Sequence, residues 1–139
     1  MGYKIEIDDG RIPVTINNHR KEEIGVIYIN PSDFNILTRL EEVKKNMEKI
    51  PDFKEDITGD SVIEADRYVR EQIDYLFGDK VSDTVFKNQH SMSTLKGVTF
   101  VERLIEGLTP VIEQIITKEV KSSEERMKKY TSAYGNDEK

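Results

Sequence analysis

Residues 99–120 have the sequence TFVERLIEGLTPVIEQIITKEV and carry the longest amphipathic pattern in the chain. Their apolar residues recur in steps of three and four, which is the spacing of one helix face. Thr99 and Glu102 form a capping-box pattern, which predicts a helix start. Pro110 removes a backbone hydrogen bond without disturbing the pattern, so we expect either a kink one turn earlier or two helices, with Thr109 capping the second.

The apolar stripe of this segment is wide because several of its residues come in adjacent pairs. A stripe of this width either lies buried between two other helices or serves both the core and an interface with a partner. The sequence is compatible with both arrangements, and we take the stripe as the candidate partner-binding surface. Its members are Val101, Leu104, Ile105, Leu108, Val111, Ile112, Ile115 and Ile116.

Two further helices are predicted upstream of this segment. Asn30-Pro31-Ser32-Asp33 has the residues of a helix start, and an apolar stripe follows from Phe34 to Ile50. Ser61 and Glu64 form a second capping-box pattern, and Gly78 is placed to end that helix in a left-handed conformation. Between positions 79 and 98 the pattern weakens, and we expect a short helical turn over 82–86 followed by a loop.

The N-terminal third predicts β-strands. Two runs of alternating apolar residues flank Asp9-Gly10, and a two-residue turn there would place both runs on one face of a hairpin. The β-branched run 24–29 predicts a third strand, and Pro13 indicates a strand with one unpaired side. The alternating runs are Tyr3, Ile5 and Ile7, then Ile12, Val14 and Ile16.

These elements predict an α+β fold: a small N-terminal antiparallel β-hairpin or three-stranded meander, followed by a bundle of three to four helices. We expect a single domain over 1–120 and a charged C-terminal tail over 121–139 that is a frayed helix or disordered. Apolar residues make up 36% of the chain and charged residues 35%, so the fold should have a highly charged surface. With no membrane-span or export pattern, we expect a soluble, cytoplasmic protein.

Charge and composition exclude several classes of function. The net charge is −6, and basic residues are interspersed with acidic ones, which disfavours both nucleic acid and anionic membranes as partners. The chain has no cysteine, so disulfides, thiolate metal sites and cysteine nucleophiles are excluded.

No catalytic, metal or cofactor site is predicted. His19 and His90 both lie in polar loop contexts without a second ligand at helical spacing. The acidic segment 52–60 has Ile57 where a calcium-binding EF-hand loop requires glycine. The glycines stand singly, without phosphate-binding spacing. We therefore expect a protein that binds other chains and is not an enzyme.

In pattern, the chain resembles the tail assembly chaperones of long-tailed, siphovirus-like bacteriophages and prophages of Gram-positive hosts. The segments that carry the resemblance are 27–36 (IYINPSDFNI), 73–79 (IDYLFGD) with 84–86 (TVF), and 100–105 (FVERLI) with 108–112 (LTPVI).

The resemblance implies a non-enzymatic role in phage tail assembly. Such proteins coat the aggregation-prone tape measure protein and help tail tube proteins to assemble around it. They act in the cytoplasm of the bacterial host and are generally absent from the mature virion. Our first hypothesis is therefore a homo-oligomer that holds its client through the face of residues 100–116, with the strand edge at Pro13 as a second candidate contact. The alternative is a small acidic phage-encoded inhibitor or adaptor that binds a host protein, and salt-sensitive binding would distinguish it.

Overall fold

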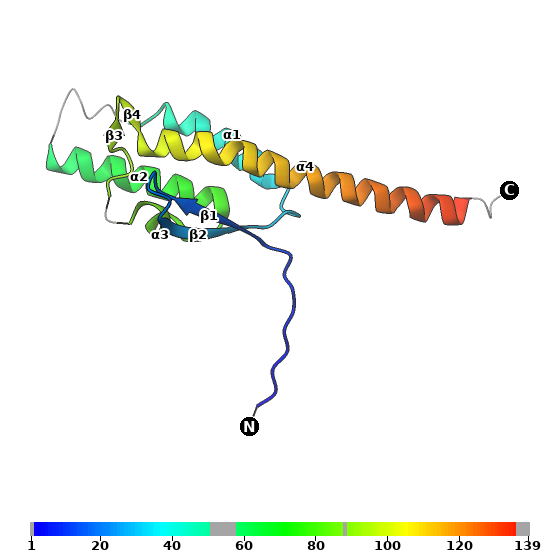
Figure 1. The fold of residues 1–139 in the computed structure, drawn as a ribbon. Helices are drawn as coiled ribbons and strands as arrows, with labels where there is room; N and C mark the ends of the chain where they lie inside the picture. The colour runs from blue at the N-terminus through cyan, green and yellow to red at the C-terminus, as the bar shows by residue number, and fades with distance from the viewer. Residues whose placement is uncertain (1, 51–57, 88, 136–139) are drawn as a thin grey trace.

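The computed structural model describes residues 2–50, 58–87 and 89–135, and it confirms the predicted α+β class. An antiparallel hairpin is followed by helices (Figure 1). The elements are β1 (Ile12–Asn17), β2 (Glu23–Ile29), α1 (Asn35–Met47), α2 (Gly59–Phe77), α3 (Ser82–Phe86), β3 (Thr94–Leu95), β4 (Val98–Thr99) and α4 (Phe100–Gly135).

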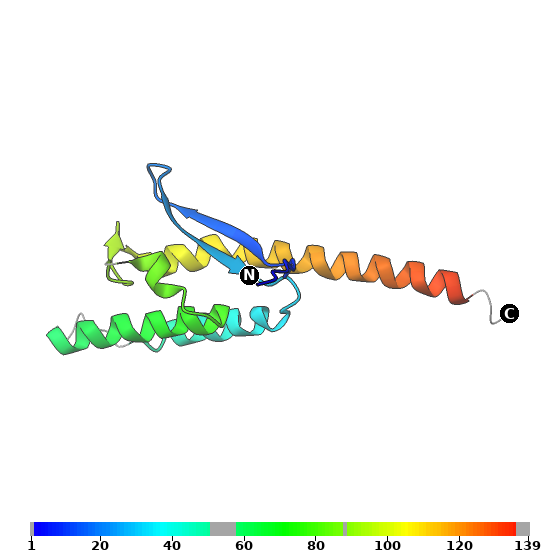
Figure 2. The same ribbon diagram turned by 90° about the horizontal axis from the view of Figure 1, so that it is seen from below.

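The three long helices and the hairpin enclose one core. α1 packs against both α2 and α4, while the short α3 connects α2 to strand β2. Figure 2 shows the β1–β2 hairpin lying across α4 on the side away from α1 and α2. The apolar residues of all these elements meet in the middle. The most completely buried include Ile27, Ile29, Val43, Val69, Ile73, Leu76, Phe86 and Ile112.

The predicted hairpin around Asp9-Gly10 is wrong. β1 pairs antiparallel with β2, so that Val14 faces Ile27 and Ile12 faces Ile29. The segment 2–11 is extended and contains no assigned strand, and it leaves the body as an N-terminal arm. The hairpin is therefore built from the second and third predicted strands.

Asn18 explains why the chain turns after β1. Its side-chain oxygen accepts hydrogen bonds from the backbone N–H groups of Arg20 and Glu22 at 2.9 and 3.0 Å. Its own N–H donates to the Glu22 carbonyl at 2.9 Å, and Lys21 takes a positive φ of 64°. Asparagine favours such turns because its short side chain mimics a backbone carbonyl.

Both upstream helices begin at other residues than predicted. α1 begins at Asn35, and the Asn30 side chain instead accepts the N–H of Ser32 in a turn before the helix. In α2 the capping box joins Thr58 to Ser61. Ser61 is therefore the third helical residue and not the cap. α1 also ends earlier than predicted, at Met47, so the helix does not continue through Ile50 as the apolar stripe indicated. Most of the acidic segment 52–60 lies outside the described residues.

The end of α2 and the following turn agree with the prediction. Gly78 has φ 69° and ψ 20°, the left-handed conformation of a helix C-cap. The carboxylate of Asp74 then accepts hydrogen bonds from the backbone N–H groups of Val81 and Ser82, which satisfies the start of α3. In place of a plain loop, β3 and β4 form a small second hairpin.

α4 is one unbroken helix, so the two-helix alternative at Pro110 is wrong. Glu106 and Pro110 are both exposed, which leaves the carbonyl that proline cannot pair open to water. The hydroxyl of Thr109 donates a hydrogen bond to the Ile105 carbonyl oxygen one turn earlier, at 2.7 Å. The predicted tail is helical as far as Gly135, and this distal half of α4 projects beyond the body (Figure 1).

Candidate protein-binding surfaces

The stripe predicted as a partner-binding surface is mostly used inside the chain itself. Six of its eight residues are at most 8% exposed and belong to the core, while Val111 and Ile115 are half-buried. Burial of these six residues in the chain's own core leaves Val111 and Ile115 as the stripe residues that a partner could contact in this fold. The six core residues are Val101, Leu104, Ile105, Leu108, Ile112 and Ile116.

A groove of about 520 Å³ lies between β1 and the first half of α4. Val14 and Ile16 line its β1 side, and Leu108 and Val111 line its α4 side. Gly107 leaves part of the wall open, since a Cβ atom there would meet nothing within 4 Å. The groove therefore has an apolar floor with a polar rim that includes Asn18, Gln89 and Arg103, and it has room for side chains.

β1 presents its edge to this groove. Within the described part of the chain, β1 pairs with β2 alone. The four consecutive residues from Val14 to Asn17 all line the groove. Because neighbouring side chains of a strand point to opposite faces, four consecutive lining residues indicate that the groove reaches the strand's unpaired edge, and Ile24 of β2 shows that it also extends under the hairpin. Such an edge carries N–H and C=O groups that can pair with another strand.

A second hollow of about 370 Å³ continues this line along α4. Ile12 at the start of β1 and Ile115 on α4 contribute its apolar lining, together with Pro31. The two hollows follow β1 from one end to the other. A partner lying along β1 would contact both.

Arg70 on α2 holds the far end of the groove in place. Its guanidinium donates to the carbonyl oxygens of Lys87 and Gln89 at 3.0 and 2.9 Å, and Gln89 lines the groove. It also lies 5.4 Å from the centre of the Phe86 ring, which packs edge-on against Phe100 at 5.1 Å. Phe100 is a lining residue too, so Arg70 supports two parts of the wall.

Asp66 in turn fixes Arg70. Its carboxylate accepts the Nε–H of Arg70 at 2.9 Å and the backbone N–H of Ser91 at 2.8 Å. Burial raises the pKa of Asp66, but the Ser91 N–H and the Arg70 charge outweigh it and hold the pKa below its usual 3.8. The carboxylate is therefore ionised at neutral pH and keeps the Arg70 contacts charged.

The distal half of α4 is a second exposed surface. Every residue from Lys121 to Ser132 is exposed. Val120, Met127 and Tyr130 are 38%, 62% and 61% exposed. Met127 lies close to two helical turns beyond Val120, so these side chains share one side of the helix. That side continues the line of buried Ile112 and Ile116 out of the body.

The titratable side chains of the described residues form no cluster suited to a metal ion. His90 has a structural role: its Nδ1 accepts the N–H of Met92 at 3.0 Å, which leaves Nε2–H to donate to the Val62 carbonyl at 2.9 Å. His19 lies in the turn after β1, as predicted, and its position there makes it part of the groove lining.

Comparison with protein families, curated proteins and solved structures found no match. No helix in the described ranges has the length and apolar character needed to cross a membrane. The surfaces described above, and the resemblance in sequence pattern, are the basis for assigning a function.

Two features of the surface, the groove and the apolar side of distal α4, could not be predicted from the spacing of apolar residues in the sequence. The groove exists because β1 turns toward β2 and exposes its other edge to α4, which depends on the strand pairing. The exposed stretch of α4 was recognised as a charged tail, but its apolar side depends on the helix continuing to Gly135. The sparse spacing of Val120, Met127 and Tyr130 was the available signal.

Proposed function

We propose that this chain is a non-enzymatic chaperone that holds an apolar helical segment of another protein, and that its client is a phage tape measure protein. The observation that supports this proposal best is the distal half of α4. It projects from a well-packed body and carries Val120 and Met127 on one side, with charged residues around them.

An exposed amphipathic helix of this kind suits a helical client. Apolar side chains one and two turns apart can pack against the stripe of a second helix, and the flanking charges keep the complex dissolved. The net charge of −6 adds repulsion between complexes, which opposes their aggregation. The contact needs only a few apolar residues, so it is weak and releasable, as a temporary holder of a client requires.

The biological setting follows from the resemblance in segments such as 27–36 and 100–105. A tail assembly chaperone keeps the tape measure protein from aggregating in the host cytoplasm until tail tube proteins assemble around it. It acts as a homo-oligomer along a long client and is not retained in the virion. In this proposal the client contacts move from the stripe 101–116 to the exposed end of α4.

Co-expression with the tape measure protein of the same locus tests this function. The parent chain should raise the soluble fraction of that protein several-fold. Met127→Asp should abolish the gain, because a buried charge opposes packing against an apolar stripe. Ser132→Asp is the matched control, since it places the same side chain on the opposite side of the same exposed helix.

If the tape measure protein gains no solubility with the parent chain, the chaperone role is wrong. If Met127→Asp raises the soluble fraction of the tape measure protein as much as Ser132→Asp does, the chaperone binds its client through another surface. The assignment of the client site to distal α4 is then wrong.

A further inference from the structure

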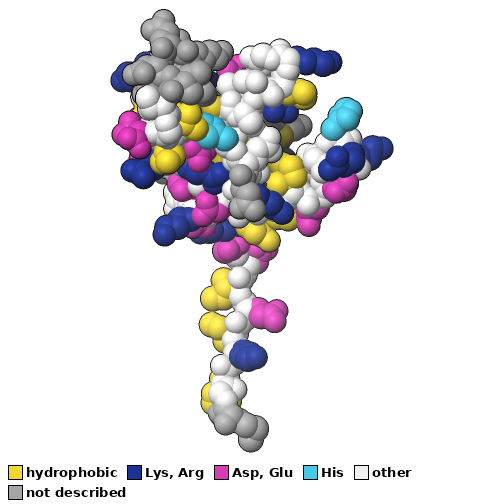
Figure 3. All heavy atoms as spheres, turned by 90° about the vertical axis from the view of Figure 1, so that its left-hand side faces the viewer, with side chains coloured by type: hydrophobic (Ala, Val, Ile, Leu, Met, Phe, Trp, Pro, Cys, Tyr) yellow, Lys and Arg dark blue, Asp and Glu magenta, His cyan; other side chains and the backbone are white. Residues whose placement is uncertain are grey.

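The N-terminal arm, residues 2–11, is an extended segment without a strand partner in the described structure. Its apolar residues alternate with charged ones and are almost wholly exposed: Tyr3 by 104%, Ile5 by 83% and Ile7 by 79%. Figure 3 shows hydrophobic side chains along one side of the arm and charged side chains on the other. This is the pattern of a strand that buries one face.

The same molecule offers a matching acceptor. β1 has an edge that faces an apolar groove against α4, and the groove has room for added side chains. We propose that the arm of a second copy adds to this edge as an antiparallel strand, and that the two copies exchange arms reciprocally.

The alternation of side chains limits the register of this pairing, and the positions of the two hollows along β1 favour one of the allowed registers. Directly opposed residues in an antiparallel pair point to the same face. Placing Ile5 opposite Val14 and Ile7 opposite Ile12 satisfies this rule, since Val14 faces the core. The same register places Glu6 opposite Pro13, which has no N–H and so contributes one hydrogen bond fewer to the pairing. In this register the arm follows β1 along both hollows, with Tyr3 and Ile5 beside the larger one and Ile7 beside the smaller one.

Charge supports the same pairing. Two basic and three acidic residues give the arm, residues 2–11, a net charge of −1. Among the described residues that line the larger hollow, Arg103 is the one with a fixed charge, and it is positive. The smaller hollow is lined by Lys118 and Glu119 and is neutral, so the attraction for the acidic arm comes from Arg103 in the larger one.

The turn geometry favours exchange over folding back within one chain. A two-residue hairpin turn at Asp9-Gly10 requires a positive φ at Asp9, alone or together with Gly10. Of these two residues only Gly10 has a positive φ, which is 74°. Local hydrogen bonds hold the segment in this form: Asp8 accepts the N–H of Gly10 at 2.8 Å and Asp9 that of Arg11 at 3.0 Å.

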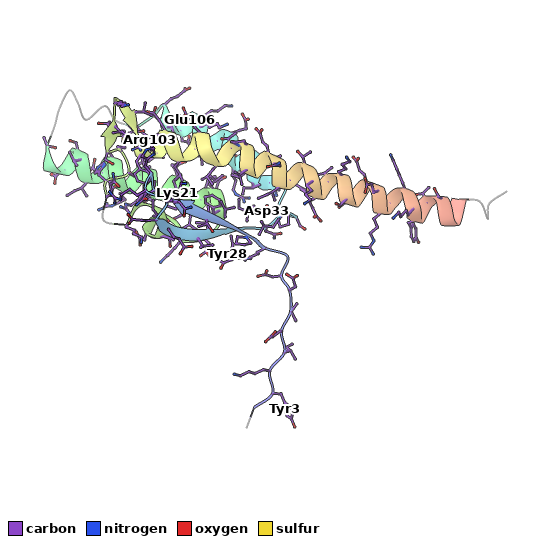
Figure 4. All side chains as sticks on the ribbon, in the orientation of Figure 1. Tyr3, Lys21, Tyr28, Asp33, Arg103 and Glu106 are labelled. Carbon is purple, nitrogen blue, oxygen red and sulfur yellow. The ribbon has the colours of Figure 1, made fainter. Side chains whose placement is uncertain are left out.

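As a result the arm points away from its own groove, and Tyr3 lies at its far end, remote from the body (Figure 4). A second copy can reach it there. The register is also self-complementary: if Ile5 of one copy opposes Val14 of the other, the reverse pair forms at once. Such symmetry closes the assembly as a dimer.

Disulfide trapping tests the register, and the absence of native cysteine makes it clean. Lys4 and Thr15 are exposed and are opposed in the proposed register. Separately purified Lys4→Cys and Thr15→Cys chains, mixed and oxidised, should form a disulfide-linked heterodimer. Lys4→Cys mixed with Thr38→Cys, an exposed position on α1, should form none.

The double variant Lys4→Cys/Thr15→Cys separates exchange from folding back. Under the proposal it oxidises to linked dimers. If it instead oxidises within single chains while the mixture of single variants yields no heterodimer, the arm folds onto its own β1 and the proposal is wrong. No disulfide in either experiment also overturns it.

Mass measurement by light scattering provides an independent test. The parent chain should have twice the 16.1 kDa of one chain. Ile5→Asp should return the mass to 16.1 kDa, whereas Lys4→Asp, with the same side chain on the opposite face, should not. Gly107→Phe should also dissociate the dimer by filling the groove, while Gly107→Ala should leave it intact. A parent chain of 16.1 kDa at every concentration overturns the proposal.

Discussion

Gly25 occupies the point where β2 passes closest to α3. A Cβ atom built there would lie 2.5 Å from Cγ2 of Thr84 and 3.2 Å from its carbonyl oxygen. Threonine is β-branched and has few allowed χ1 rotamers, so its Cγ2 atom cannot easily rotate away to relieve the clash. We expect Gly25→Ala to lower the free energy of unfolding by about 1–3 kcal/mol, measured by urea denaturation.

A second substitution identifies the cause. Thr84→Ser removes Cγ2 but keeps the hydroxyl, so the Gly25→Ala/Thr84→Ser double variant should recover part of the loss. Gly107→Ala is the control, since its Cβ meets nothing and alanine favours the helix. If Gly25→Ala lowers the free energy of unfolding equally with and without Thr84→Ser, the contact with Cγ2 is not the cause of the loss.

Asp66 makes the stability of the groove wall dependent on pH. Its pKa lies below the usual 3.8 in the folded chain, so its contribution to stability is complete above the unfolded-state pKa. The contribution is lost as the pH falls through the folded-state pKa. The parent should therefore lose stability below about pH 4, and Asp66→Asn should lose about 1–3 kcal/mol at neutral pH and show a flatter acid limb.

Asp83→Asn is the matched control for this measurement. Asp83 also pairs with Arg70, at 3.0 Å, but its side chain is 91% exposed. Exposed ion pairs contribute about 0–1 kcal/mol, so this variant should remain close to the parent at every pH. If the two variants behave alike, the Ser91 N–H and the burial of Asp66 have no measurable effect.

At the scale of elements, the helices were predictable because their signals are local. Apolar spacing and Gly78 fixed where α2 lies and ends, and 82–86 was recognised as helical. The starts were less certain, since Thr58 and Ser61 are both competent caps three residues apart and only the fold decides which one takes the role.

The strand pairing was predicted only in part: a three-stranded meander contains the β1–β2 pair that forms, whereas the pair of residues 3–7 with 12–16 does not form. β1 had two possible partners with suitable alternation, the arm before it and the run after it. The second is chosen because Ile27 and Ile29 become 1% exposed against the helices, while Gly25 admits the close contact with α3. The burial of Ile27 and Ile29 depends on helices far along the chain, and the spacing of apolar residues within the strands carries no information about those helices. The same non-local packing places the stripe 101–116 in the core.

At the scale of the whole molecule, a packed body carries two projections, the N-terminal arm and the distal half of α4 (Figure 1). The two have different chemistry. The arm has the side-chain alternation of a β-strand but pairs with no strand in the described structure, and β1 of the same chain has an unpaired edge. Distal α4 is a helix with a narrow apolar side formed by Val120, Met127 and Tyr130. Self-association and client binding are thus assigned to separate surfaces.

This separation predicts that the two properties can be removed independently. A chain ending at Val120 lacks a segment in which every residue from Lys121 to Ser132 is exposed. Its free energy of unfolding should stay within about 0.5 kcal/mol of the parent, measured by urea denaturation. Its mass in solution should still be that of a dimer, but it should no longer solubilise the tape measure protein.

Ile5→Asp should show the converse: a 16.1 kDa species in which Met127 and its neighbours remain available to the client. A client bound at one helix needs no second copy for the contact itself, although it binds a dimer more tightly because two helices act together. Ile5→Asp should therefore weaken solubilisation without abolishing it. Complete loss in Ile5→Asp would mean that exchanged arms build the client site, and that the two projections form a single surface.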